Sequence, residues 1–220
     1  MKLYQSNLSP YASRCRIMIY AKGIEDIEYV SPPGGISSDE FKKINPTGRI
    51  PALEVDGRVF GESGILCEYL EDRYPTPSLR PEGLLELASA RLIAQIADAY
   101  ILGPLFVLLP IMNPKDRDEK VVETQTALLK KNLLLLEKTM RDSGYDDANY
   151  AVGGRLSLAD CALVPALFVT VNVLPAFGIS APLEATPALI HYWQAILKDE
   201  FCGRVHEEMV EGMKARLGAG

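Results

Sequence analysis

Two serines stand where a hydroxyl could contact a bound anion. Ser9 precedes Pro10 at the predicted start of a helix, because serine favours the N-cap position and proline the first helical position. Ser63 follows Glu62 at the start of another segment with helical apolar spacing. Helix N-termini expose backbone N–H groups and the positive end of the helix dipole. Both positions therefore suit a negatively charged ligand group.

The stretch from Asn45 to Pro75 must position the second serine. It opens with turn residues and continues with a short strand that starts at Pro51, a position where a strand tolerates proline. Asp56-Gly57 is the strongest short hairpin signal, and a return strand follows it. The stretch therefore predicts a turn, a β-hairpin and a helix in succession.

The segment before this stretch predicts alternating strands and helices. We expect a strand at residues 2–5, a helix from Ser9-Pro10 to Gly23, a second strand at residues 27–30 and a short helix from Ser38. A strand, helix and strand of this length predict a right-handed parallel crossover. The order βαβαββα over the first 75 residues or so indicates a thioredoxin-like arrangement.

The rest of the chain predicts helices. Proline-rich residues 74–81 are typical of a linker, and Gly103-Pro104 is expected to kink the first long helix after it. Further helices are expected at residues 116–141, 157–171, around 187–193 and after Asp199. We predict an α+β two-domain protein with a thioredoxin-like domain at residues 1–76, a linker at 77–84 and an all-helical bundle at 85–220.

Asp160 is the acidic residue with the clearest local role in the helical part. Ser157 and Asp160 lie three residues apart ahead of an apolar run, which is the spacing of a capping box. We therefore interpret Asp160 as a structural cap and not as an acid catalyst.

Composition excludes several classes of function. The chain has 220 residues, 48% of them hydrophobic, and a net charge of −6 without a long run of one sign. This argues against nucleic acid or an anionic membrane as the main partner. No signal-peptide core or membrane-length apolar run is seen, so a cytoplasmic location is the default. The four cysteines form no C-x-x-C pair and the two histidines lie far apart, so we expect buried thiols and no metal site.

The motifs resemble those of the cytosolic glutathione S-transferase family. The segment Ser9-Pro-Tyr-x-x-Arg-x-Arg16 is similar to that of its serine-type members, in particular the tau and zeta classes. The stretch from Asn45 to Pro75 resembles the glutathione-binding half. The resemblance implies a cis peptide at Pro51 and a γ-glutamyl end held by Glu62 and Ser63. It also implies that the backbone of Ile50, beside Pro51, pairs with the cysteinyl part of glutathione. Arg49 is then expected near the glycine carboxylate.

The resemblance also implies that Ser9 contacts the glutathione sulfur. A thiol pKa of about 8.5 must fall by about two units to give mostly thiolate at neutral pH, which requires about 2.7 kcal/mol. A hydroxyl donor at a helix N-terminus can supply this stabilisation. Tyr4 would be the candidate in a tyrosine-type enzyme, and Ser6 and Ser13 are weaker candidates. The pocket for an electrophile is expected near three aromatic residues, Tyr11, Tyr100 and Phe106.

The expected function is glutathione transfer to a small hydrophobic electrophile, as in detoxification, by a homodimer with glutathione as co-substrate. A glutathione-dependent isomerase similar to maleylacetoacetate isomerase is an alternative, as are a dehalogenase and an etherase. A non-catalytic binding protein with the transferase fold is a further alternative.

Overall fold

The computed structural model describes residues 1–218, and its N-terminal part is built on a four-stranded sheet of order β2-β1-β3-β4. The strands are β1 (Lys2–Tyr4), β2 (Glu28–Val30), β3 (Ala52–Val55) and β4 (Arg58–Phe60). β1 pairs with β2 in parallel, as the predicted crossover requires, and the other pairs are antiparallel. Asp56 and Gly57 both have positive φ angles, as the predicted two-residue hairpin demands.

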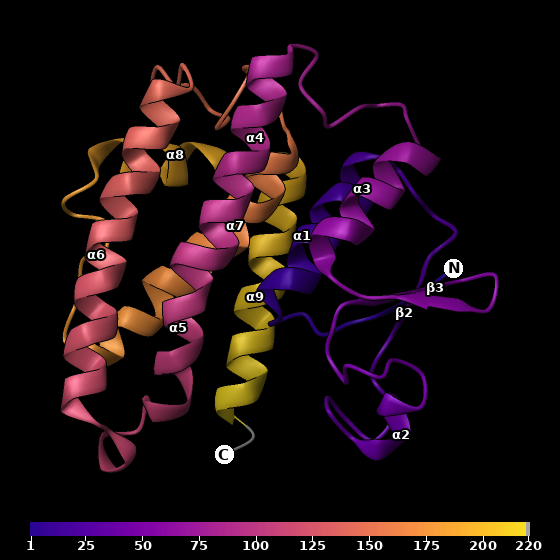
Figure 1. The fold of residues 1–220 in the computed structure, drawn as a ribbon, viewed down its shortest axis with the longest axis horizontal. Helices are drawn as coiled ribbons and strands as arrows, with labels where there is room; N and C mark the ends of the chain where they lie inside the picture. Colours follow the sequence, from indigo (N-terminus) through magenta and orange to yellow (C-terminus); the bar gives the residue numbers. More distant parts are fainter. Residues whose placement is uncertain (219–220) are drawn as a thin grey trace. The chain divides into compact units, whose positions relative to one another are not determined.

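Three helices accompany this sheet (Figure 1), and the predicted order βαβαββα is confirmed. They are α1 (Pro10–Ala21), α2 (Asp39–Lys42) and α3 (Ser63–Arg73). Tyr4, Phe41 and Ala52 are buried together in a small core. The side chain of Ser38 accepts a hydrogen bond of 3.0 Å from the backbone N–H of Phe41 and so caps α2. The local signals of the sequence thus give the thioredoxin-like domain.

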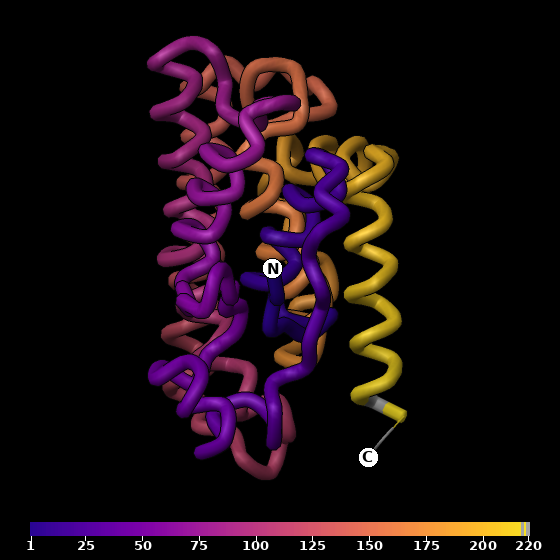
Figure 2. Tube along the Cα trace, turned by 90° about the vertical axis from the view of Figure 1, so that its right-hand side faces the viewer, coloured from indigo at the N-terminus to yellow at the C-terminus, as the bar shows by residue number. Residues whose placement is uncertain are grey.

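The last helix belongs to the same compact unit as the sheet. This unit consists of Met1–Leu79 and the described part of Glu200–Gly220, which forms α9 (Glu200–Gly218). Figure 2 shows α9 as a long helix that ends the described chain. The domain boundaries at 1–76, 77–84 and 85–220 stay a prediction, and the compact units differ from them in the placement of α9.

A buried ion pair holds the end of the first unit before residue 80. Nζ of Lys22 lies 2.8 Å from the Glu71 carboxylate and donates to the carbonyls of Tyr74 and Pro77, both at 2.7 Å. The other Glu71 oxygen accepts from the Leu79 backbone N–H at 3.0 Å. The proline-rich segment is therefore fixed to α1 and α3 by charge-assisted hydrogen bonds.

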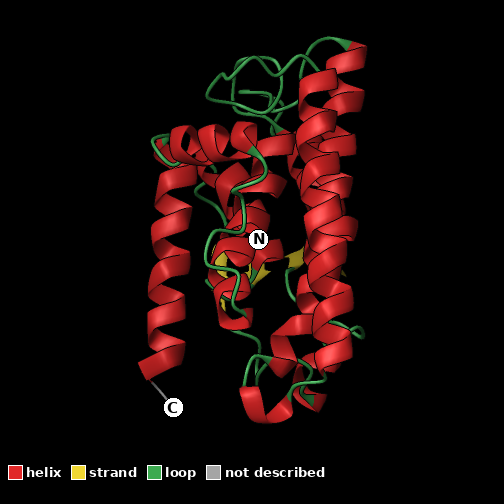
Figure 3. Cartoon of the chain, turned by 90° about the vertical axis from the view of Figure 1, so that its left-hand side faces the viewer, coloured by secondary structure: helices red, strands yellow, loops and turns green. Residues whose placement is uncertain are grey.

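The second unit, Arg80–Asp199, is helical throughout its regular structure (Figure 3). Its α-helices are α4 (Leu84–Ile96), α5 (Gly103–Leu108), α6 (Glu119–Asp142), α7 (Leu158–Val173) and α8 (Pro187–Ile196), with short 3-10 turns at Leu109–Ile111, Pro114–Asp116 and Leu174–Phe177. Helix α7 is buried along almost its whole length and contacts α4, α5 and α8. The all-helical character predicted for this part is confirmed.

At Gly103-Pro104, where a kink is expected from the sequence, the structure has a π-helical segment, Ala97–Leu102, between α4 and α5. Pro104 has no N–H and so cannot bond the carbonyl of Tyr100 four residues earlier. The N–H of Gly103 bonds the carbonyl of Asp98, which is the i−5 pattern of a π-helix. The Tyr100 carbonyl accepts instead from the Asn132 side-chain amide of α6 at 2.8 Å. The helical run therefore continues past the proline.

Two helical runs are long and apolar enough, by length and composition only, to cross a membrane: Leu84–Ile111 and Leu158–Phe177. The sequence prediction that the chain has no apolar run of membrane length is therefore wrong by length and composition. In Leu84–Ile111 the π segment lets the helical run continue past Pro104. The window in Leu158–Phe177 is 83% buried, which is typical of the core helix of a globular unit.

Candidate active site

Ser9 is the N-cap residue of α1. Its Oγ accepts a hydrogen bond of 3.3 Å from the backbone N–H of Ala12, and its own N–H donates to the Ser6 carbonyl at 3.0 Å. This cap uses a lone pair of the hydroxyl, so the proton can still donate to a ligand. Among the described residues the structure records no acceptor for that proton. The predicted cap is confirmed, and it leaves the hydroxyl chemically available.

The turn before β3 lies at the same end of the sheet as the chain leading to Ser9. Tyr4 pairs with Ala52 in antiparallel register, so Pro51 enters the sheet where β1 leaves it. The Ile50–Pro51 peptide is cis, as the family resemblance implies. Asn45 fixes the turn by donating from its side-chain amide to the Arg49 carbonyl at 2.8 Å. Arg49 itself is exposed.

Glu62 and Ser63 form the start of α3 in an unusual conformation. Glu62 is the N-cap residue with φ 63° and ψ 104°, and its side chain makes no capping hydrogen bond. A non-glycine residue at positive φ costs about 1–3 kcal/mol, and such strain gathers at ligand sites. The first N–H groups of α3 therefore have no side-chain cap and suit a carboxylate ligand.

Arg14 is a candidate that the sequence analysis did not single out. Its Nη1 donates to the Ser63 Oγ at 3.3 Å, and both residues are buried. A buried guanidinium beside the start of α3 adds positive charge where an anion is expected. The only sequence signal was the first arginine of the Ser9–Arg16 segment, with nothing local to indicate Ser63 as its partner. The contact joins the N-terminal parts of α1 and α3.

The weaker serine and tyrosine candidates have structural partners. The hydroxyl of Tyr4 donates to the Glu54 carboxylate at 2.8 Å, and burial together with Glu54 raises the pKa of Tyr4. A phenol with a raised pKa and a carboxylate partner is a poor donor to a thiolate. Ser13 accepts from Nη2 of Arg16 at 2.9 Å. Ser9 is therefore the better candidate for the sulfur contact.

The three aromatic candidates for a pocket belong to different units. Tyr11 is half-buried in the first turn of α1, in the unit that carries the sheet. Tyr100 and Phe106 lie in the second unit, 47% and 40% exposed, on the π segment and α5. Their grouping into one pocket stays a prediction.

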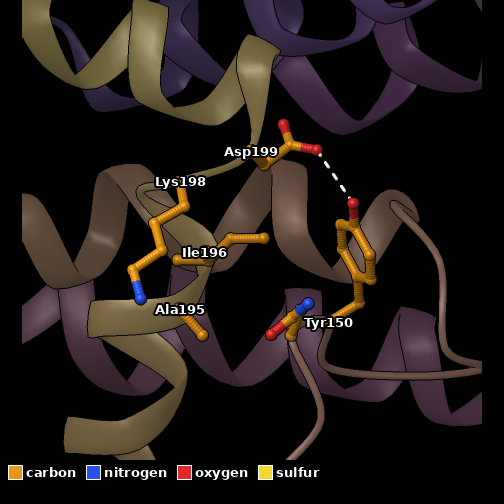
Figure 4. Close-up of a pocket in the computed structure, with 6 residues that line it drawn as sticks. Tyr150, Ala195, Ile196, Lys198 and Asp199 are labelled. Atoms are coloured by element: carbon orange, nitrogen blue, oxygen red, sulfur yellow. Dashed lines mark hydrogen bonds between the residues drawn. The ribbon is translucent and has the colours of Figure 1, made fainter.

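A pocket in the second unit has a different composition from the expected site. It has a volume of about 110 Å³ and is lined by Asn149, Tyr150, Ala195, Ile196, Lys198 and Asp199. The Tyr150 hydroxyl donates to Asp199 at 3.1 Å (Figure 4). Ligand sites for small molecules usually have about 300 Å³ or more. The pocket contains none of the predicted site residues and is too small for a tripeptide.

In the described part of the chain, no group of three or more acidic, histidine or cysteine side chains could hold a metal ion. All four cysteines are buried thiols, as the sequence predicts. Asp160 is buried within the predicted capping box with Ser157, which confirms its structural role.

Comparison with known proteins identifies the family. Two family models match the chain: "Glutathione S-transferase, N-terminal domain" over residues 3–78 and "Glutathione S-transferase, C-terminal domain" over residues 105–200. Maleylacetoacetate isomerase of Dictyostelium discoideum is 34% identical to this chain, over 73% of the chain and 75% of that protein.

Two solved structures of similar fold are consistent with this family. Maleylacetoacetate isomerase from Anaeromyxobacter dehalogenans, with glutathione bound in its active site, matches with 26% identity and a TM-score of 0.73, covering 94% of this chain and 95% of that one. A tau-class glutathione S-transferase from mango (Mangifera indica) has a TM-score of 0.80, with 24% identity and 97% coverage of each chain, and supports the fold. The chain belongs to the glutathione S-transferase family and is an enzyme of this glutathione-dependent family.

Proposed function

We propose that the chain lowers the pKa of the glutathione thiol through the Ser9 hydroxyl and directs the thiolate to a small hydrophobic electrophile. The observation that carries this proposal is the position of Ser9 as a cap whose proton is available, at the sheet end where the cis Pro51 turn begins. The hydroxyl donates to the sulfur, and the α1 dipole adds a favourable field. The required stabilisation is about 2.7 kcal/mol for a shift of two pKa units.

The three residues of glutathione are assigned to four contacts. The uncapped start of α3 at Ser63 receives the γ-glutamyl carboxylate, and Glu62 pairs with the ammonium group. The backbone of Ile50, beside Pro51, pairs with the cysteinyl part. The exposed Arg49 receives the glycine carboxylate. Tyr11, Tyr100 and Phe106 remain the residues that the sequence predicts to contact the electrophile.

The test is a Ser9→Ala variant with a matched control. Ser38→Ala removes the other serine cap near the sheet, so both variants lose about 1 kcal/mol of helix stabilisation. Only Ser9→Ala should raise the pKa of bound glutathione, by about two units towards 8.5, as followed by the ultraviolet absorbance of the thiolate. An unchanged pH profile in Ser9→Ala would contradict the proposal.

Isomerisation is the second candidate, favoured by the relatives named maleylacetoacetate isomerase. A thiolate that adds to a cis double bond and leaves after rotation isomerises the substrate and is released, whereas conjugation consumes it. Maleylacetoacetate, a chloro-nitrobenzene and an aryl ether should be compared while glutathione consumption is measured. Isomerised product with constant glutathione identifies the isomerase. Retention on immobilised glutathione without turnover of any substrate would favour a binding protein.

We also propose that the protein is a cytoplasmic homodimer, as expected for this family. The native mass in solution tests the oligomeric state directly. A mass equal to that of one chain, 24.2 kDa, at micromolar concentration would contradict it.

A further inference from the structure

The loop between β1 and Ser9 is held by a buried arginine. Arg16 is 1% exposed, and its Nη1 donates to the side-chain oxygens of Gln5 (3.0 Å) and Asn7. Its Nη2 donates to the Asn7 backbone carbonyl and to Ser13 Oγ, both at 2.9 Å. One guanidinium thus fixes the side chain and the carbonyl of Asn7, two residues before Ser9. Such a planar fork of donors defines position and orientation together.

Helix α9 supplies the counter-charge for this arginine. Oε2 of Glu208 lies 3.2 Å from Nε of Arg16, and Oε1 accepts from the Tyr20 hydroxyl at 2.9 Å. Arg204 of the same helix lies over the Tyr20 ring, 3.7 Å from its centre. Helices α1 and α9 run beside each other in this unit (Figures 1 and 2). The ion pair therefore connects the last helix to the loop through Arg16.

Gly212 brings the backbone of α9 against the same loop. It lies one helical turn after Glu208, and a Cβ atom there would be 3.2 Å from the Leu8 backbone nitrogen and 3.4 Å from Cβ of Asn7. Glycine inside a helix costs about 1 kcal/mol relative to alanine. The close approach to the residue directly before Ser9 accounts for glycine at this position.

We infer that α9 is a positioning element for the Ser9 hydroxyl. Gly212 sets how closely the Leu8 backbone approaches α9. Glu208 sets the orientation of Arg16 and, through Arg16, that of Asn7. Both act on the two residues before Ser9 from a helix nearly 200 residues later in the chain. The inference rests on the proposed role of Ser9, and it adds residues that touch neither glutathione nor the electrophile.

Gly212→Ala tests the contact. The new Cβ forces the Leu8 backbone to yield by a few tenths of an ångström. A misplacement of about 1 Å can cost about 100-fold in rate, so we expect kcat to fall about 3- to 10-fold. The KM for glutathione should change little, and the pKa of bound glutathione should rise. Gly218→Ala is the matched control, since a Cβ there on the same helix meets nothing within 4 Å.

Glu208→Gln tests the ion pair without adding volume. It should lower kcat and raise the pKa of the bound thiol in the same direction, whereas Glu208→Asp, which keeps the charge, should recover part of the loss. This pair of variants decides the question if Gly212→Ala does not fold. The unmodified protein is expected to lower the pKa of the bound thiol. If that pKa is equally low in both Gly212→Ala and Glu208→Gln, the inference is overturned, while the role of Ser9 stays intact. An ordinary thiol pKa in the unmodified protein would overturn the role of Ser9 itself, and the inference with it.

Discussion

Replacing Asp160 by asparagine should change the pH dependence of stability. The Asp160 side chain is fully buried, and one carboxylate oxygen accepts from Ala151 N–H (2.8 Å) and the Tyr192 hydroxyl (3.0 Å). The other accepts from the Ser157 N–H and hydroxyl, both at 2.9 Å. Burial is the largest influence and raises the pKa of Asp160 to about 6, although the four donors oppose it.

The sign of the effect follows from proton binding. Between the unfolded pKa of about 3.9 and the folded value, the folded state holds the proton of Asp160 and the unfolded state has lost it. Stability therefore falls as pH rises through this window, by about 3 kcal/mol in total. Below the window the contribution is fully present, and above it the contribution is lost.

Asp160→Asn removes this dependence and adds a constant penalty. A protonated carboxyl oxygen still accepts a hydrogen bond, but an amide NH₂ does not, so either Ala151 N–H or Ser157 N–H loses its acceptor. A buried backbone N–H without an acceptor costs about 1–3 kcal/mol. The variant should thus be less stable by about that amount near pH 4, and the two proteins should become similar near pH 7.

Trp193 provides the assay. It is the single tryptophan and lies in α8, so its fluorescence during urea unfolding reports on the unit that contains Asp160. Asp142→Asn is the control, since its side chain is 63% exposed and its pair with Lys138 contributes about 0.5 kcal/mol or less. A difference between Asp160→Asn and the unmodified protein that does not vary with pH would refute the raised pKa. Loss of glutathione affinity in the folded variant would refute the structural role.

Two further substitutions test buried charges in the first unit. Lys22→Met leaves the Glu71 carboxylate buried without its counter-charge and should lower the free energy of unfolding by about 3–5 kcal/mol, measured by urea unfolding; the double variant with Glu71→Gln should recover much of the loss. Arg14→Gln should raise the KM for glutathione about tenfold or more with little change in kcat, because the bond to Ser63 serves binding and not the reaction step. An exposed Arg73→Gln control should leave KM unchanged, and a fall in kcat alone for Arg14→Gln would contradict the assignment.

Features set by neighbouring residues could be predicted from the sequence. Asp56-Gly57 determines its hairpin because both residues tolerate positive φ. Ser9-Pro10 starts α1, and Ser157 with Asp160 caps α7, because each signal lies within four residues. The βαβαββα order and the helical second part follow from a series of such local signals.

Features set by distant residues could not be predicted. Arg14 meets Ser63 from 49 positions away, and nothing near either residue indicates the contact. The same is true of Glu208 and Arg16 on the last and first helices. Gly103-Pro104 was expected to kink its helix, but the outcome depends on Asn132 of α6, which accommodates the carbonyl that the proline leaves without a donor. Such pairings depend on tertiary packing, which single-chain periodicity does not encode.

The two serine caps of the first unit explain why Ser9 requires distant support. The hydroxyl of Ser38 accepts from Phe41 N–H at 3.0 Å and donates to the Pro33 carbonyl at 2.7 Å, so the cap itself fixes its orientation. The Ser9 hydroxyl accepts a longer bond of 3.3 Å, and its proton is left for a ligand. A hydroxyl kept available for a thiolate cannot also be oriented by a second local bond. Its position must then come from the backbone before it, which Arg16 and α9 hold at Asn7 and Leu8.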